Sequence, residues 1–160
     1  AVHWASAALA RNPGRAPAVR HQAEDFSIVA PMAGVEDATP AYVGALRKLA
    51  DAGAAVLICV GAADDGAVAP VRALWPSAPI LIGSDTTFNP KMNNVRKGFE
   101  AAGREVVALC DAGIALDLDE LCRAAAGLSD RVGLVLALKA GDDAQNFAAE
   151  VERAYIDGHQ

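Results

Sequence analysis

Two polar segments carry the side chains in this sequence that are best suited to chemistry. The first is NPKMNN at residues 89–94, and the second is Asp111, which follows the apolar run 106–110. In the first segment, the Asn89 side chain is suited to cap a helix, and Pro90 suits the first helical position because the N–H there has no intrahelical partner. The pattern predicts a helix that carries a cation in its first turn.

The charges of these two segments favour a ligand that bears phosphate. Lys91 lies in the predicted first turn, where free backbone N–H groups and the helix dipole already favour an anion. Asp111 follows a predicted buried strand, and ligands of open α/β sheets bind at the carboxyl ends of the strands. A carboxylate there suits Mg²⁺ or Mn²⁺, because such ions take one or two carboxylates and complete their shell with phosphate oxygens and water. We therefore favour a nucleotide-sugar as the ligand.

Each of these side chains also has a structural interpretation that the sequence leaves open. Lys91 fits a solvated lysine on the first turn, and Asp111 fits a loop cap that accepts backbone hydrogen bonds. Asn93 and Asn94 are poor helix formers, so two of them near a helix start indicate a polar role, although surface positions explain them as well.

Two further segments are predicted to reach the same edge of the sheet. Pro31 and Gly34 follow the first apolar run and would shape a tight turn that lets backbone approach a flat ligand. Asp64 and Asp65 follow the second run, where a carboxylate can accept hydrogen bonds from a base or a ribose. An ordinary loop and ordinary turn chemistry are the alternatives at these two places.

Short apolar runs alternate with helical patterns along most of the chain, which predicts an α/β fold with a mostly parallel sheet flanked by helices. The expected strands are 26–30, 54–60, 80–82, 105–110 and 132–138. The expected helices are 39–51, 67–75, one opened by Asn89, one capped by Asp117 with Glu120 three residues on, and 145–155.

Composition excludes several classes of protein. The 160 residues suffice for one domain with a core, and we expect it to span residues 26–160. A net charge of −6 argues against nucleic acid as a partner, since binding to a phosphate backbone needs a basic surface. The three cysteines form no Cys-x-x-Cys pair, and all three histidines (His3, His21, His159) lie in the terminal segments, so a histidine-based general acid or metal cage is not expected.

The first 25 residues are expected to form a juxtamembrane or disordered leader. Ala1–Ala10 is mostly apolar but far shorter than the roughly 20 residues that cross a bilayer. The arginines that follow at 11, 15 and 20 fit either a disordered leader or the positive cytoplasmic flank of a membrane helix.

Four motifs in order resemble the ceramide glucosyltransferase family, including its bacterial relatives such as the hopanoid-associated glycosyltransferases. The motifs are Pro31-x-x-Gly34, Asp64-Asp65, NPKMNN at 89–94 and CDAGI at 110–114. The resemblance covers about residue 26 to the end of the chain, and Asn-Pro-Lys-x-Asn-Asn is its most specific element.

The resemblance implies a fold and an activity. It implies the nucleotide-binding half of a GT-A fold, a UDP-sugar donor carrying a hexose or N-acetylhexosamine, a divalent cation, and inverting transfer to a lipid hydroxyl. Asp64 or Asp65 matches the family's first aspartate, in the nucleotide pocket, and Asp111 matches the second, which holds the metal. A membrane-associated enzyme facing the cytoplasm, in bacteria at the inner membrane, is implied as well, with the membrane reached through segments outside this soluble chain.

The family's third aspartate, the expected base, and its Gln-x-x-Arg-Trp motif are not found in the sequence. We therefore expect a donor-binding portion that is incomplete at its C-terminus and inactive by itself. The main alternative is a non-catalytic, receiver-like binding module that uses Asp64, Asp65 and Lys139. A truncated product with an exposed sheet edge and no activity is the third possibility.

Overall fold

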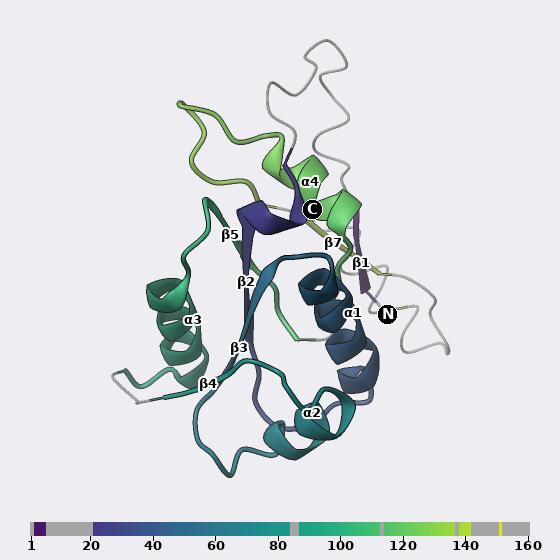
Figure 1. Cartoon of the computed structure of the whole chain (residues 1–160), viewed down its shortest axis with the longest axis vertical. Coiled ribbons are helices and arrows are strands. Elements are labelled where there is room, and N and C mark those ends of the chain that lie inside the picture. The colour runs from purple at the N-terminus through teal and green to yellow at the C-terminus, as the bar shows by residue number, and fades with distance from the viewer. Residues whose placement is uncertain are drawn as a thin grey trace. The chain divides into compact units, whose positions relative to one another are not determined.

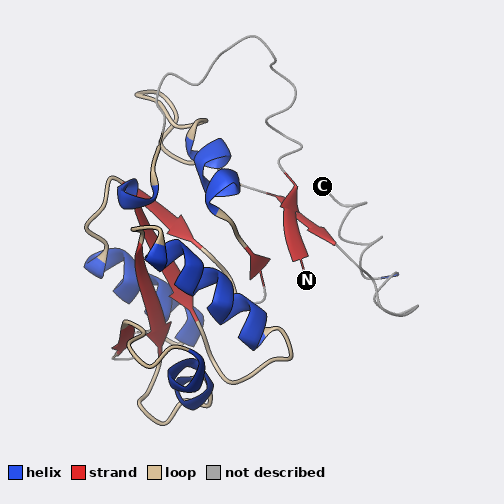
Figure 2. Ribbon diagram, turned by 45° about the vertical axis from the view of Figure 1, so that its right-hand side comes forward, coloured by secondary structure: helices blue, strands red, loops and turns tan. Residues whose placement is uncertain are grey.

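The structure is a computed structural model of the chain, and it describes residues 2–5, 21–83, 87–112, 114–136, 138–141 and 151. Figures 1 and 2 show these residues as ribbons. The chain divides into two compact units. One is Gln22–Gly113, and the other combines Ala1–His21 with Ile114–Gln160.

The unit Gln22–Gly113 is built on a four-stranded sheet in which every neighbouring pair is parallel. Its strands are β2 (Phe26–Pro31), β3 (Ala55–Val60), β4 (Ile80–Ile82) and β5 (Val106–Leu109), in the order β4-β3-β2-β5. All six residues of β2 are buried, as expected of an apolar run in a central parallel strand. The predicted α/β class with a parallel sheet flanked by helices is confirmed.

Three helices cover the two faces of this sheet. Helices α1 (Thr39–Asp51) and α2 (Val68–Leu74) lie on one face, and α3 (Pro90–Ala101) lies on the other (Figures 1 and 2). The buried side of α1 has helical spacing because its buried residues recur every three or four positions. These residues are Thr39, Tyr42, Val43, Leu46 and Leu49.

Gly98 allows α3 to lie very close to the sheet. A Cβ atom built on Gly98 would overlap the side chain of Val29 and would lie 3.0 Å from the sulfur of Cys59. Since Val29 is in β2 and Cys59 is in β3, the helix packs across the two central strands. The sequence offered no sign of this requirement, because a glycine inside a helix pattern merely lowers helix propensity.

The strand order reverses between β2 and β5. The chain first builds outward from β2 through β3 to β4, and then crosses through α3 to add β5 on the other side of β2. In open α/β sheets the loops at such a point diverge and leave a crevice at the carboxyl ends of the strands. The loops after β2 and β5 therefore flank the expected ligand site.

The other unit contains a small mixed sheet and one helix. Its strands are β1 (Val2–Ala5), β6 (Ile114–Ala115) and β7 (Leu138–Gly141), and β1 pairs in parallel with β6 and antiparallel with β7. Helix α4 (Leu118–Ala125) begins as predicted, with a capping box between Asp117 and Glu120.

The predicted strand 132–138 is wrong. Val132 forms an isolated antiparallel bridge with Ser129, and residues 133–136 have no regular structure. Leu134 and Leu136 are 71% and 75% exposed. A strand needs a neighbouring strand to satisfy its backbone N–H and carbonyl groups. The N–H and the carbonyl of Val132 are instead both hydrogen-bonded to Ser129 in a tight turn. The strand that does form, β7, starts at the last residue of the predicted segment.

Two predictions fall largely on residues outside the described ranges. Of the predicted helix 145–155, the described part is Val151, which is helical. Of the predicted leader 1–25, Val2–Ala5 form β1 and Ala23–Asp25 form the short 3-10 helix η2. Within the described parts of the chain, no helix has the length and apolar character needed to cross a bilayer.

Replacing Gly98 with alanine should destabilise the protein, whereas the same change at Gly44 should not. The new methyl group at position 98 meets Val29 and Cys59, and overpacking of this kind costs about 1–3 kcal/mol. Gly44 is an exposed position of α1 with no atom within 4 Å of a built Cβ, so alanine there should stabilise the helix by roughly 0.5–1 kcal/mol. Urea unfolding of the two variants measures both effects, and equal effects would contradict the close packing of α3.

Candidate functional site

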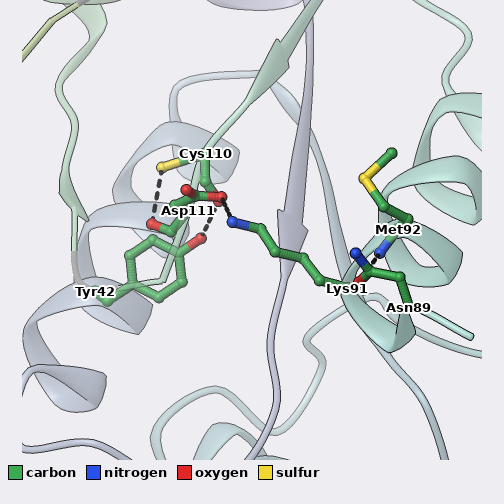
Figure 3. Close-up of polar contacts among 6 residues, drawn as sticks. All are labelled: Tyr42, Asn89, Lys91, Met92, Cys110 and Asp111. Carbon is green, nitrogen blue, oxygen red and sulfur yellow. Dashed lines mark hydrogen bonds and ion pairs between the residues drawn. The ribbon is translucent and has the colours of Figure 1, made fainter.

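Lys91 and Asp111 meet at the carboxyl ends of the parallel strands. The Nζ atom of Lys91 lies 2.8 Å from Oδ1 of Asp111, although the two residues come from α3 and from the loop after β5. Figure 3 shows the lysine side chain stretched from the start of α3 towards the carboxylate. The ion pair therefore spans the point where the strand order reverses.

The start of α3 is held by its own polar residues. The side chain of Asn89 caps the helix, since its Oδ1 accepts a hydrogen bond of 3.2 Å from the N–H of Met92 (Figure 3). Asn93 is buried and holds Thr87 in the preceding loop, because its Oδ1 accepts from both the N–H and the hydroxyl of Thr87 and its Nδ2 donates to the carbonyl. These bonds fix the turn from which Lys91 extends.

Two further side chains of α3 bind backbone carbonyls at the ends of the central strands. Asn94, which is buried, donates from Nδ2 to the carbonyl of Met32 just after β2. Lys97 donates from Nζ to the carbonyl of Val60 at the end of β3, over 2.6 Å, and also to Oδ1 of Asn94. The carbonyl of Val60 also accepts a hydrogen bond from the N–H of Gly83 next to β4, so Lys97 is a second donor to it, whereas Asn94 supplies a donor to a carbonyl beyond the end of β2.

A buried tyrosine supports the backbone next to Asp111. The hydroxyl of Tyr42 in α1 donates to the carbonyl of Cys110 over 2.7 Å (Figure 3). The N–H of Cys110 donates to the carbonyl of Val29. Burial raises the pKa of Tyr42 well above its ordinary value. The charge of the Cys110 side chain and the hydrogen bond with that side chain raise this pKa further. The phenol therefore stays protonated and keeps donating, so the backbone just before Asp111 is fixed on both sides.

The loops after β2 and β3 are joined by Asp65. Its Oδ1 accepts hydrogen bonds of 2.9 Å from the N–H groups of Gly34 and Ala67. Gly34 has a φ of 67°, a conformation that side chains other than glycine rarely adopt. Pro31 is the buried last residue of β2, and Asp64 is exposed. Asp65 thus shapes the turn that the sequence predicted at Pro31–Gly34, while Asp64 faces solvent.

The structure brings some of the predicted site residues together and gives others backbone partners. Lys91 and Asp111 contact each other, and Gly34 contacts Asp65. Asn93 and Asn94 use their amides to hold Thr87 and Met32, so their observed contacts are positioning contacts.

Two residues that position the site, Tyr42 and Lys97, were not predicted from the sequence. Tyr42 lies in the apolar stripe of α1, where a tyrosine hydroxyl requires a partner when it is buried. Lys97 lies three residues after Asn94, the spacing at which two side chains share one helix face. These patterns indicate that a partner is needed, but they do not identify a partner far away in the sequence.

The side chain of Asp111 fits a metal ion that arrives with a phosphate ligand. Among the residues that the structure describes, no group of three or more His, Cys, Asp and Glu side chains is arranged to hold a metal. Asp111 supplies a single carboxylate, and its side chain is 27% exposed. Mg²⁺ commonly binds proteins through one or two carboxylates together with substrate phosphates and water, so this donor set suits such an ion.

Comparison with known proteins supports the resemblance seen in the motifs. No solved structure matches the chain. The model of the family described as glycosyl transferase family 21 matches residues 1–160, which is the whole chain.

Replacing Tyr42 with phenylalanine should destabilise the protein by about 1–3 kcal/mol. The ring remains, but the carbonyl of Cys110 loses its buried donor, and an unsatisfied buried polar group costs that much. Chemical unfolding followed by circular dichroism measures the difference. A change below about 0.5 kcal/mol would show that water replaces the hydroxyl and that Tyr42 does not support the end of β5.

Replacing Asp65 with alanine should cost about 1–2 kcal/mol, because the N–H groups of Gly34 and Ala67 both lose their acceptor. Asp64→Ala is the matched control: this neighbouring aspartate is exposed, so its removal should change the stability by less than about 0.5 kcal/mol. Thermal unfolding of both variants at the same pH distinguishes them. Equal losses would show that the two loops are not joined through Asp65.

Proposed function

The chain belongs to glycosyl transferase family 21, and from that premise we propose that the carboxyl edge of its large sheet binds the diphosphate of a UDP-sugar. The observation that carries this proposal is the 2.8 Å pairing of Lys91 with Asp111 at the point where the strand order reverses. A cation at a helix start and a strand-end acid are two groups suited to a metal-bound diphosphate. Membership of a glycosyltransferase family also disfavours the alternative of a non-catalytic, receiver-like binding module.

Each proposed role follows from the position of the residue. The ammonium of Lys91 and the first turn of α3 neutralise negative charge on the phosphates. Asp111 holds Mg²⁺ or Mn²⁺, which when bound acts as a Lewis acid on the diphosphate leaving group. Asp64, which is exposed, accepts hydrogen bonds from the ribose or the base. Asp65 acts through Gly34, whose turn leaves room for the nucleoside.

The whole protein, in this proposal, transfers a hexose or an N-acetylhexosamine with inversion to the hydroxyl of a ceramide-like or hopanoid-like lipid. A GT-A arrangement supplies the donor half, and membrane association comes through segments outside this chain. Inverting transfer needs a general base that takes the proton of the acceptor hydroxyl. No residue of this chain is assigned that role, so the proposal covers donor binding by these residues.

Titration of the chain with UDP should reveal metal-dependent binding that requires Asp111. In calorimetry, Mn²⁺ should strengthen UDP binding by about tenfold or more, a difference of roughly 1.4 kcal/mol. Asp111→Asn should remove this enhancement because the amide is a poor metal ligand. Asp119→Asn should retain it, because it removes the same negative charge from an exposed residue of α4. Undiminished enhancement in Asp111→Asn would contradict the metal role of Asp111. A wild-type chain that does not bind UDP with Mn²⁺ would overturn the proposed function.

A further inference from the structure

We propose that Lys91 and a divalent cation are alternative counter-ions of Asp111, and that the binding of the metal-bound donor transfers the ammonium of Lys91 from the carboxylate to the diphosphate. This inference rests on the proposed function, since it concerns how the same site changes when the donor arrives. It assigns Lys91 two successive partners.

The two cations compete for the carboxylate of Asp111. The Nζ atom of Lys91 already lies 2.8 Å from Oδ1 of Asp111. A divalent ion lies about 2 Å from the carboxylate oxygen that it binds, so an ion on Oδ1 would take the place of the ammonium, and an ion on Oδ2 would be its close like-charged neighbour. Like charges at such short range repel strongly unless an anion separates them. The carboxylate therefore favours one of the two cations at a time.

The ion pair between Lys91 and Asp111 is also easily exchanged. The side chains of Lys91 and Asp111 are 57% and 27% exposed, and Nζ of Lys91 contacts Oδ1 of Asp111. Partly exposed pairs of this kind add little net free energy. Lysine also presents a compact charge on a flexible four-carbon chain, which can change partners without moving the backbone.

The side chain of Lys91 is the partner that moves in this exchange. The backbone before Asp111 is held by Tyr42 and by the ladder bond from Cys110 to Val29. The backbone of Lys91 is held as well, because Asn89 caps the helix in which Lys91 lies. The long lysine side chain lies between these two fixed points, and its tip is the part that can rotate (Figure 3).

The released ammonium has a second anion within reach once the donor binds. Lys91 is in the first turn of α3, where the helix itself leaves backbone N–H groups without intrahelical partners and favours negative charge. A diphosphate bound between Asp111 and this turn offers oxygen atoms to the same side chain. The exchange therefore keeps both the carboxylate and the ammonium paired before and after the donor binds.

The test uses Lys91→Met with Arg96→Met as its matched control. Both changes remove one positive charge from α3 at side chains that are 57% and 58% exposed, but Arg96 pairs with Glu100 on its own helix. The affinity for Mn²⁺ alone is measured by electron paramagnetic resonance of the free ion, and the affinity for UDP with saturating Mn²⁺ is measured by calorimetry.

Lys91→Met should change the two affinities in opposite directions. Without UDP, it should bind Mn²⁺ about fivefold more tightly than Arg96→Met, because the competing ammonium is gone. With Mn²⁺ present, it should bind UDP roughly tenfold more weakly, because the diphosphate loses a charged donor.

A Lys91→Met variant whose Mn²⁺ affinity equals that of Arg96→Met, or falls below it, would overturn the exchange. The proposed function would still stand in that case if the wild-type chain binds UDP with Mn²⁺ in a manner that requires Asp111. Both variants alter exposed side chains, so matching circular dichroism spectra and unfolding midpoints should accompany the binding data.

Discussion

The attachment of α3 to the sheet is the constraint on which the candidate site depends. Gly98 lets the helix approach β2 and β3 more closely than any side chain would permit. Asn94 and Lys97 then bind the carbonyls of Met32 and Val60 at the carboxyl ends of the same two strands. A helix held by apolar contacts alone can slide or rotate when side chains repack, but these hydrogen bonds fix α3 to the backbone of the strands. Its first turn is thereby fixed at the edge where ligands bind.

The opposite side of the site is fixed in a comparable way. Tyr42 on α1 and Asn94 on α3 lie on helices that cover different faces of the sheet, and each donates to a carbonyl just beyond the end of a strand. Such carbonyls have left the regular ladder, so a buried one costs free energy without a donor. The hydrogen bonds that satisfy these carbonyls therefore also position the loops. The loop after β5 is held by α1 on one face of the sheet, and the loop after β2 is held by α3 on the other face.

Sequence patterns predicted the elements of this fold wherever a local rule decides the structure. The helix 39–51, the cap at Asn89 and the capping box at Asp117 all follow from residues within four positions of one another. The run 132–138 failed because its outcome depends on a neighbouring strand, which no local pattern reveals. Apolar character indicates that a segment can be a strand, while pairing decides whether it is one.

The same distinction applies to the candidate site. The meeting of Lys91 and Asp111 could be predicted because parallel strands place all their carboxyl ends at one edge. The partners of Asn93, Asn94 and Tyr42 could not, because a polar side chain in a helix pattern shows only that it needs a hydrogen bond. Tyr42 and Cys110 are 68 residues apart, and only the folded chain brings them together.

The charges of the site explain why we propose that the donor binds together with a divalent cation. The chain carries a net charge of −6, and Asp111 adds a negative charge at the very edge where a diphosphate is proposed to bind. Lys91 can balance either Asp111 or a phosphate, and the helix start contributes only about half a positive charge. A diphosphate beside both groups would leave the crevice strongly negative. In the proposed exchange, a divalent cation would restore the balance, and because it would pair with the carboxylate of Asp111, Lys91 would become available to the diphosphate when the ligand binds.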